Sequence, residues 1–229
     1  MSLFVIGDLH LSLCADKKMD VFRGWENYTE RIVLNWKNTV TDSDSVILLG
    51  DISWGMTLDE ALEDFSLINS LPGKKYIVKG NHDYWWSTQR KIENFFEQHN
   101  LSSFSILHNS AVLYDGVGIC ATRGWTPEDS SAQDKKIIAR EAMRMSASIA
   151  AAEKLGAEEK IAFLHYPPVY QDIICGEILE VLNSRGIKKC YYGHIHSEGC
   201  KFAIEGNFLG IDFKLVSADR LGFTPFKVL

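Results

Sequence analysis

The chain has little cysteine, and the cysteines that it has form no metal-binding or redox motif. Their number is odd, at five, and no two of them are separated by only two residues. This spacing indicates neither a disulfide framework nor a Cys-x-x-Cys site. We interpret the cysteines as small core or strand residues in a protein of a reducing compartment.

Long apolar runs, a basic leader and linker-like segments are also lacking. No stretch approaches the roughly 20 apolar residues that cross a bilayer, and no basic segment precedes the first apolar run. No segment rich in Pro, Gly or Ser divides the chain, and no internal repeat is present. We therefore expect one domain over residues 1–229, in the cytoplasm and without a membrane partner.

An excess of positive charge is missing as well. The chain has 24 Lys and Arg against 30 Asp and Glu, which gives a net charge of −6 and a pI near 5.6. Without a basic surface for phosphate backbones, a nucleic-acid partner is disfavoured. This argument is weak by itself, because bound metal ions can reverse the local field. Hydrophobic residues make up 46% of the chain, which suffices for a core without disulfides.

What the chain does have is a set of short polar blocks, each at the end of an apolar run. Together these blocks hold five of the seven histidines. Metal-binding side chains that recur at strand ends suggest one site assembled from distant segments. The blocks are Asp8-Leu9-His10, Gly50-Asp51, Gly80-Asn81-His82-Asp83, His165, and Gly193-His194-Ile195-His196.

The first third of the chain alternates strand and helix patterns. Apolar runs at 3–6, 46–49 and 76–78 predict buried strands. The apolar spacing from Phe22 to Val40 predicts one helix, and a capping box at 57–60 predicts the start of another. This alternation implies parallel βαβ units, in which ligands bind at the carboxyl ends of the strands. The polar blocks that follow these strands should therefore converge.

The second half of the chain has a different pattern, richer in hairpins. Here we expect a hairpin at 111–121 that turns at Asp115-Gly116, a helix over about Ser131 to Leu155, strands at 161–164 and 190–192, and a closing meander of 202–204 and 208–216 that turns at Gly206-Asn207.

Most blocks are ambiguous when taken singly. Asp8 and His10 can share one cation, but they also fit a turn residue and an incidental histidine. Asp51 fits a helix cap or a turn as well as a carboxylate that bridges two metals. His194 and His196 form the strongest single block, because two histidines one residue apart can reach neighbouring metals from one loop.

The remaining two blocks add a possible proton donor. Asn81 offers a neutral oxygen ligand, His82 a proton, and Asp83 a carboxylate that can orient or stabilise that histidine. An ordinary Asn-His turn explains the same residues. A lone histidine at a strand end, such as His165, is more often structural than a ligand.

In combination, the five blocks resemble the ordered motifs of the calcineurin-like metallophosphoesterase superfamily, D-x-H, G-D, G-N-H-[DE], H and G-H-x-H, as found in its small bacterial-type phosphohydrolases. The resemblance implies an α/β fold, a four-layer α/β/β/α sandwich with mixed sheets. It further implies two metal positions, one held by Asp8, His10, Asp51 and His196 and the other by Asp51, Asn81, His165 and His194, with Asp51 bridging.

The resemblance also implies an activity. A metal-activated hydroxide would attack a small phosphomonoester or phosphodiester, with His82 as general acid and Asp83 in a catalytic role beside it. The cofactors would be two divalent ions, Mn, Fe or Zn and also Ni or Co, because nitrogen and oxygen ligands of this kind disfavour Ca. A scaffold that keeps the fold without catalysis, and a nuclease, are the alternatives. The filled ligand positions count against the scaffold, and the missing basic stripe counts against the nuclease.

Candidates for substrate contacts come from outside the ligand positions. The acid and arginine of the phosphoprotein phosphatases are missing after Gly50-Asp51, which disfavours that subfamily, and an arginine at the site would come from elsewhere. Arg123 is a candidate phosphate contact, although a surface arginine fits as well. Trp54 and Tyr84 are candidates for stacking on a flat group, and core packing is the alternative. The same two interpretations apply to Trp85, Trp86 and Trp125. The substrate, the native metals and the oligomeric state do not follow from the motifs.

Overall fold

The computed structural model describes residues 1–127 and 131–229 and divides the chain into two compact units. Unit 1 comprises Met1–Ile106 and Val216–Leu229, and unit 2 comprises Leu107–Leu215. Each unit has its own sheet with helices packed against it. The predicted α/β class with mixed sheets is confirmed, because both sheets combine parallel and antiparallel strands. A single domain over the whole chain stays a prediction.

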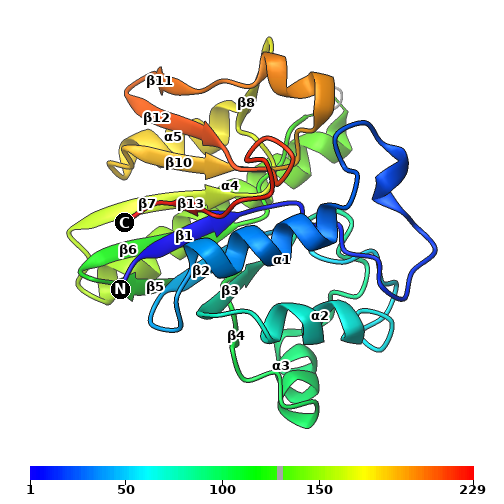
Figure 1. Cartoon of the computed structure of the whole chain (residues 1–229). Coiled ribbons are helices and arrows are strands. Elements are labelled where there is room, and N and C mark those ends of the chain that lie inside the picture. Colours follow the sequence, from blue (N-terminus) through cyan, green and yellow to red (C-terminus); the bar gives the residue numbers. More distant parts are fainter. Residues whose placement is uncertain (128–130) are drawn as a thin grey trace. The chain divides into compact units, whose positions relative to one another are not determined.

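Unit 1 is built on a five-stranded sheet whose order is β13-β1-β2-β3-β4. The first four strands of the chain are parallel, which confirms the predicted βαβ units, and the last strand pairs with the first in antiparallel orientation. Figure 1 shows this pairing as the red strand beside the blue one. The strands are β1 (Leu3–Ile6), β2 (Ser45–Leu49), β3 (Lys74–Val78), β4 (Phe104–Ile106) and β13 (Phe226–Lys227).

The helices of unit 1 bury one stripe each against this sheet. In α1, the side chains of Tyr28, Ile32 and Trp36 recur at four-residue spacing and are all buried. Thr88 caps α3, because its side chain accepts a hydrogen bond from the Lys91 N–H. The helices are α1 (Tyr28–Thr39), α2 (Leu62–Asn69), α3 (Gln89–Gln98) and the short 3-10 helix η1 (Met19–Val21).

Two predicted helix starts in unit 1 are wrong. α1 begins at Tyr28, so Phe22 and Trp25 lie outside it, and Trp25 is instead buried edge-on against the rings of Tyr28 and Phe223. The capping box does form, since the Glu60 N–H donates to Thr57 Oγ1 at 3.2 Å and the Glu60 carboxylate accepts from the Met56 N–H at 2.8 Å. It closes a separate turn, however, and α2 starts only at Leu62.

Unit 2 is built on a six-stranded sheet in the order β11-β12-β10-β7-β6-β5, with the four inner strands parallel and both edge strands antiparallel. The helices α4 and α5 pack on it around a core that includes Met145, Ile149 and Leu182. The strands are β5 (Ser110–Tyr114), β6 (Val117–Thr122), β7 (Glu159–Leu164), β10 (Lys189–Tyr192), β11 (Gly206–Phe208) and β12 (Ile211–Leu215). The other elements are α4 (Ala132–Lys154), β8 (Val169–Tyr170), β9 (Ile173–Ile174), α5 (Gly176–Ser184) and the 3-10 helix η2 (Ser197–Phe202).

The hairpins of unit 2 show why one turn was predicted and the other missed. The predicted turn at Asp115-Gly116 is confirmed, with positive φ angles of 48° and 81°. The closing hairpin turns at Leu209-Gly210, with φ angles of 50° and 82°, so the predicted turn at Gly206-Asn207 is wrong. A tight two-residue hairpin turn needs positive φ at both positions, and a leucine rarely signals this.

No helix in the described ranges 1–127 and 131–229 is both long and apolar enough to cross a membrane.

Candidate metal centre

The donor side chains of unit 1 stand where its parallel strands end. Asp8 and His10 follow β1, Asp51 follows β2, and Asn81 follows β3. The first two loops run side by side, because the Asp8 N–H donates to the Gly50 carbonyl and the His10 N–H to the Asp51 carbonyl, both at 2.9 Å. These hydrogen bonds bring the loops after β1 and β2 together, as the sequence predicted for unit 1. We call Asp8, His10, Asp51 and Asn81 the unit 1 donor set.

The backbone of this donor set is strained. Asp8, His10 and Asp51 have φ angles of 59°, 47° and 50°, in the left-handed region that residues with a side chain rarely adopt. Each such residue costs on the order of 1–3 kcal/mol, and this strain concentrates at functional sites. In unit 2, His194 is held in the same way, with a φ of 73°. Strain at several proposed ligands points to positions chosen for function rather than for stability.

Asp83 ties the loops of the unit 1 donor set together. Its carboxylate accepts hydrogen bonds from the backbone N–H groups of Asp51 at 2.9 Å, Ile52 at 2.8 Å and Gly80 at 2.7 Å. A fourth bond comes from Trp85 Nε1 at 3.1 Å. The side chain thus links the loop after β2 to the loop after β3 and fixes where Asp51 stands. This backbone role had no signal in the sequence, where Asp83 was interpreted as a partner of His82.

Gly80 has no room for a side chain. A Cβ at this position would lie 2.1 Å from Asp51 Oδ1 and 2.2 Å from the Asp51 backbone nitrogen. Glycine is therefore required for the loop after β3 to approach the Asp51 carboxylate. The same approach lets the His82 N–H donate to Asp51 Oδ1 at 2.7 Å, which orients one oxygen of that carboxylate.

His82 lies among aromatic rings of unit 1. Its Nδ1 is 3.1 Å from the Tyr84 hydroxyl, and its ring centroid is 4.5 Å from that of Trp54. The Trp54 ring also stacks on His10, at 4.9 Å and an interplanar angle of 22°. His10 Nε2 in turn lies 3.8 Å from Asp51 Oδ2. The sequence candidates Trp54 and Tyr84 are thus brought together with His82, and Trp54 packs directly on a proposed ligand.

A second buried carboxylate, that of Asp64, anchors the loops that follow the donor residues His10 and Asp51. Asp64 of α2 accepts hydrogen bonds from Ser53 Oγ at 2.5 Å and from the Leu13 N–H at 2.9 Å. Burial raises the pKa of the Asp64 carboxyl above its usual range, against these hydrogen bonds, which lower the pKa. Sequence reasoning missed Asp64, because a single acidic residue in an amphipathic helix resembles a surface residue.

The donor side chains of unit 2 follow two adjacent parallel strands. His165 follows β7, and His194 and His196 follow β10, which pairs with β7 so that Tyr192 lies opposite Leu164. The Gly193 N–H donates to the carbonyls of Leu164 and His165, at 3.3 and 3.0 Å, and the rings of His165 and His194 are 5.2 Å apart. His165 is fully buried. We call His165, His194 and His196 the unit 2 donor set.

Arg123 stands beside this donor set, at the end of the next strand, β6. Its carbonyl accepts a hydrogen bond from the Tyr166 N–H at 2.8 Å, and its guanidinium lies 5.2 Å from the Trp125 ring and 6.0 Å from the Tyr166 ring. The Tyr166 ring is 4.3 Å from that of His194. Arg123 Nε is buried and has no hydrogen-bond partner among the residues that the structure describes. The structure therefore places this sequence candidate at the same sheet edge as the donor histidines.

A buried carboxylate of α4 holds that arginine. Glu141 is fully buried, accepts a hydrogen bond from Arg144 at 2.6 Å, and has Arg123 and Arg140 at 3.9 and 4.0 Å. Thr122 Oγ1 donates to it at 3.0 Å. A signal for Glu141 exists in the sequence, since it falls in the mainly apolar stripe that α4 buries. A charged residue in such a stripe is rarely buried without partners.

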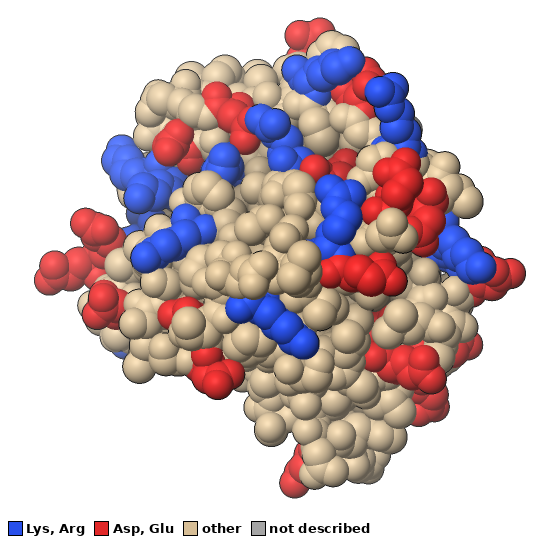
Figure 2. All heavy atoms as spheres, viewed as in Figure 1, with Lys and Arg blue, Asp and Glu red and all other residues tan. Residues whose placement is uncertain are grey.

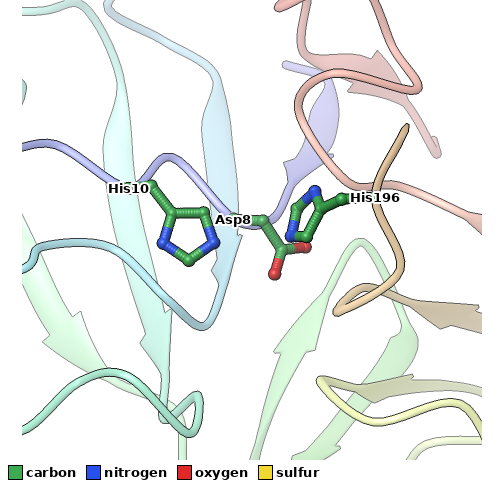
Figure 3. A group of neighbouring side chains, drawn as sticks. All are labelled: Asp8, His10 and His196. Carbon is green, nitrogen blue, oxygen red and sulfur yellow. The ribbon is translucent and has the colours of Figure 1, made fainter. Parts of the chain in front are cut away.

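The types of donor atom decide which ions the two sets suit. Unit 1 supplies Asp8, His10 and Asp51 as possible metal ligands, and unit 2 supplies His165, His194 and His196. Figure 3 labels Asp8 and His10, which come from the loop after β1 of unit 1. Imidazole nitrogen and carboxylate oxygen suit first-row transition metals, and the buried carboxylates supply the negative charge that such an ion neutralises. The residues present therefore fit divalent metals.

Known proteins share both the motifs and the fold. The family model of the calcineurin-like phosphoesterases matches residues 1–198. The chain belongs to this family. The family is one of phosphoesterases, in agreement with the resemblance that the sequence motifs carry.

Individual proteins are similar to this chain either in part of the sequence or in the fold. An uncharacterized protein of Methanocaldococcus jannaschii, MJ1445, is 31% identical over 93 residues, which are 41% of this chain and 49% of the relative. This chain thus aligns with about half the length of that curated relative. The phosphopantetheinyl hydrolase PptH of Mycobacterium tuberculosis has the same fold, with a TM-score of 0.57 at 15% identity over 100% of this chain and 95% of the other. The protein AQ665 of Aquifex aeolicus is similar too, with a TM-score of 0.53 at 14% identity over 99% and 95% of the two chains.

Proposed function

We propose that the chain is a dinuclear metal-dependent phosphohydrolase that cleaves a small phosphomonoester or phosphodiester. The observation that carries this proposal is the pair of donor sets at the carboxyl ends of parallel strands, with strained backbone at four of their members. Evolution tolerates such strain where positions serve a function. The family match supports metal-dependent ester hydrolysis at this site.

The proposal assigns each member of the two donor sets to a metal. Asp51 would be the residue shared by both ions, because it is a buried carboxylate whose oxygens are oriented separately, Oδ1 by the His82 N–H and Oδ2 towards His10. As the resemblance implies, Asp8, His10 and His196 would also hold the first ion, and Asn81, His165 and His194 would hold the second. When bound, two divalent ions at such a site lower the pKa of water and neutralise phosphoryl oxygens.

His82 is the proton donor of the proposed reaction. Its imidazole lies beside the donor set, with Nδ1 3.1 Å from the Tyr84 hydroxyl and the ring against that of Trp54, and in this proposal it donates a proton to the leaving alkoxide. A positioned general acid typically contributes about 10²–10⁴-fold to the rate. Asp83 acts as a positioning residue, since its carboxylate holds the loops of Asp51 and Gly80.

Arg123 is the proposed contact for substrate oxygens on the side of unit 2. Glu141 fixes its guanidinium, and Tyr166 joins it to the loop of His165. An arginine that is oriented in this way can donate to a phosphoryl oxygen without losing much side-chain freedom.

We also propose a cytoplasmic location and a small phosphoester rather than nucleic acid as partner. Figure 2 supports the latter, since blue basic and red acidic side chains are interspersed on the face in view.

A substrate panel tests the proposed function. Phosphomonoesters and phosphodiesters of alkyl, aryl and pantetheine alcohols would be assayed with Mn, Zn or Fe added to chelator-treated protein. We expect metal-stimulated hydrolysis of at least one ester class, together with two bound ions per chain by elemental analysis. Two bound ions without any hydrolysis would favour a non-catalytic scaffold of the same fold, and the absence of bound metal would overturn the proposal.

A further inference from the structure

Unit 1 has a cavity that the proposed chemistry does not use. Its volume is about 310 Å³, and it is lined by Lys17, Lys18, Met19, Val21, Phe22 and Trp54. All of these residues except Trp54 come from the segment around the 3-10 helix η1, between β1 and α1. Of this segment, only Phe22 was predicted to belong to a helix, and the structure places it between η1 and α1 instead.

The walls of the cavity are largely apolar and face solvent. The side chains of Val21 and Phe22 are 77% and 52% exposed. Neighbouring apolar side chains exposed to this degree are unfavourable in water, and they are retained mainly where something binds. Met19 adds a flexible side chain that adapts to different shapes.

One wall connects the cavity to the proposed general acid. Trp54 lines the cavity, and its ring is 4.5 Å from the His82 ring and 4.9 Å from the His10 ring. A group that occupies the cavity therefore lies against a ring that also contacts His82, the residue proposed to protonate the leaving alcohol. This shared wall relates the cavity to the leaving group.

The charge at this wall suits an anionic ester. Lys17 Nζ lies 4.2 Å from the Trp54 ring centroid and 5.9 Å from that of Tyr84, and both rings also contact His82. A cation held over an aromatic face keeps its charge and gives up little side-chain freedom when an anion arrives. The cavity thus offers positive charge next to His82 and apolar surface at Val21 and Phe22.

We propose that this cavity is the leaving-group pocket and that it selects phosphoesters whose alcohol carries an apolar group, with Lys17 stabilising the anionic phosphoryl end. This inference rests on the proposed function, because it takes the direction of the leaving group from His82. It names a substrate class, esters of apolar alcohols, in place of esters of small polar alcohols such as glycerol.

Binding of matched phosphonates tests the pocket without turnover. The probes are 3-phenylpropylphosphonate and propylphosphonate, titrated by calorimetry into the protein as purified with its metals. We expect the phenyl compound to bind about tenfold more tightly, because the ring is buried against Phe22 and Val21. Equal affinity of the two probes for the unaltered chain would overturn the proposal.

Two matched phenylalanine variants locate the effect. Phe22→Ser should reduce the affinity ratio of the two phosphonates to about threefold or less, because it removes one wall of the pocket. Phe202→Ser is the control, since Phe202 is exposed to a similar degree, 55%, but lies on η2 of unit 2. Both side chains are exposed, so neither change should unfold the chain. An unchanged ratio in Phe22→Ser, or an equal loss in Phe202→Ser, would refute the assignment.

Turnover of matched esters separates the pocket from the proposed function. The substrates are 2-phenylethyl and ethyl phosphate, or their methyl diesters, whose leaving groups are both primary alkoxides. Phe22→Ser should lower kcat/KM for the phenylethyl ester several-fold and leave that for the ethyl ester unchanged. A preference in phosphonate binding without hydrolysis of any ester would sink the proposed function and keep the pocket. Hydrolysis of both esters at equal kcat/KM would overturn the pocket and keep the proposed function.

Discussion

In unit 1 the donor side chains stand on loops that buried carboxylates hold together, whereas in unit 2 they stand on adjacent strand ends joined by backbone hydrogen bonds. Asp83 accepts bonds from three backbone N–H groups around Asp51, and Asp64 anchors the loop that follows. In unit 2 the Gly193 N–H bridges directly to the His165 carbonyl. A buried carboxylate of that unit, Glu141, contacts arginines instead of loops. The unit 1 donor set therefore depends on side chains outside the set, and the unit 2 set depends mainly on its strands.

The largest expected effect comes from removing the ligand that we propose to bridge. Asp51→Asn should lose both metal ions and reduce hydrolysis to background, because a neutral amide cannot bridge two cations. His194→Asn in unit 2 should lose only one ion. Elemental analysis of metal per chain measures the difference, and one remaining ion in both variants would contradict the bridging role of Asp51.

Next in size is the loss of the proposed general acid, which unit 1 alone supplies. His82→Ala should lower kcat for esters of poor leaving groups by about 10²–10⁴-fold and leave two ions bound. Esters with good leaving groups, such as p-nitrophenyl esters, should be affected far less, since they need no proton. Equal losses for both kinds of ester would remove His82 from the proton transfer.

The supporting carboxylates of the two units should affect different properties, metal affinity in unit 1 and stability in unit 2. Asp83→Asn should weaken metal affinity by about 10–100-fold, because one of the two acceptor oxygens that place the Asp51 loop becomes an NH2 donor facing backbone N–H groups. Glu141→Gln should leave metal affinity unchanged but destabilise the fold by about 1–2 kcal/mol, because the buried side chain loses its charge-assisted hydrogen bond to the partly exposed Arg144. Metal titration and urea unfolding of both variants measure the two effects. A fall in metal affinity in Glu141→Gln would show that unit 2 also relies on outside support.

A smaller effect is expected at the arginine beside the unit 2 donor set. Arg123→Gln should raise KM about fivefold with little change in kcat, since one partly exposed contact to the substrate is lost. Arg140→Gln is the control, because Arg140 lies near the same Glu141 but is about half exposed. If both variants raise KM alike, the effect comes from the Glu141 cluster and Arg123 is not a substrate contact.

Substitution of Lys75, a buried cation in β3 of unit 1, should change the stability of the fold and leave turnover unchanged. Burial lowers the pKa of Lys75 from 10.5 to about 8, and its ammonium donates to the Leu71 carbonyl. The unfolded chain therefore binds more protons between these values, so stability should rise with pH across this window, by at most about 3 kcal/mol. Lys75→Met should raise stability at pH 7 and flatten that rise. Urea unfolding from pH 7 to 10.5 checks this, and an unchanged slope would contradict it.

The blocks themselves were readable from the sequence because each depends on local order along the chain. An apolar run followed by polar residues marks a buried strand and its end, and parallel strands bring these ends to one edge. This is why Asp8, His10, Asp51 and Asn81 were correctly placed at neighbouring strand ends of unit 1. The hairpin turn at Asp115-Gly116 was readable for a similar reason, since both residues tolerate positive φ.

Other features were decided only when distant segments packed together. The helix predicted from Phe22 begins at Tyr28, because Trp25 packs against Phe223 from the last segment of the chain. The anchoring of Asp51 by Asp83 and the stacking of Trp54 on His10 likewise join residues far apart in sequence. So does the packing of Lys17 over Trp54.

The sequence by itself determined the family chemistry, because ligand types in a fixed order leave few other uses for those residues. Only the tertiary structure decided how the ligands are held and what lies beside them. Hydrogen bonds to a carboxylate such as Asp83, and a cavity such as the one at Phe22, depend on distances across the fold. Periodicity along the chain carries no information about such distances, which is the physical reason that the cavity at Phe22, our proposed leaving-group pocket, was not predicted.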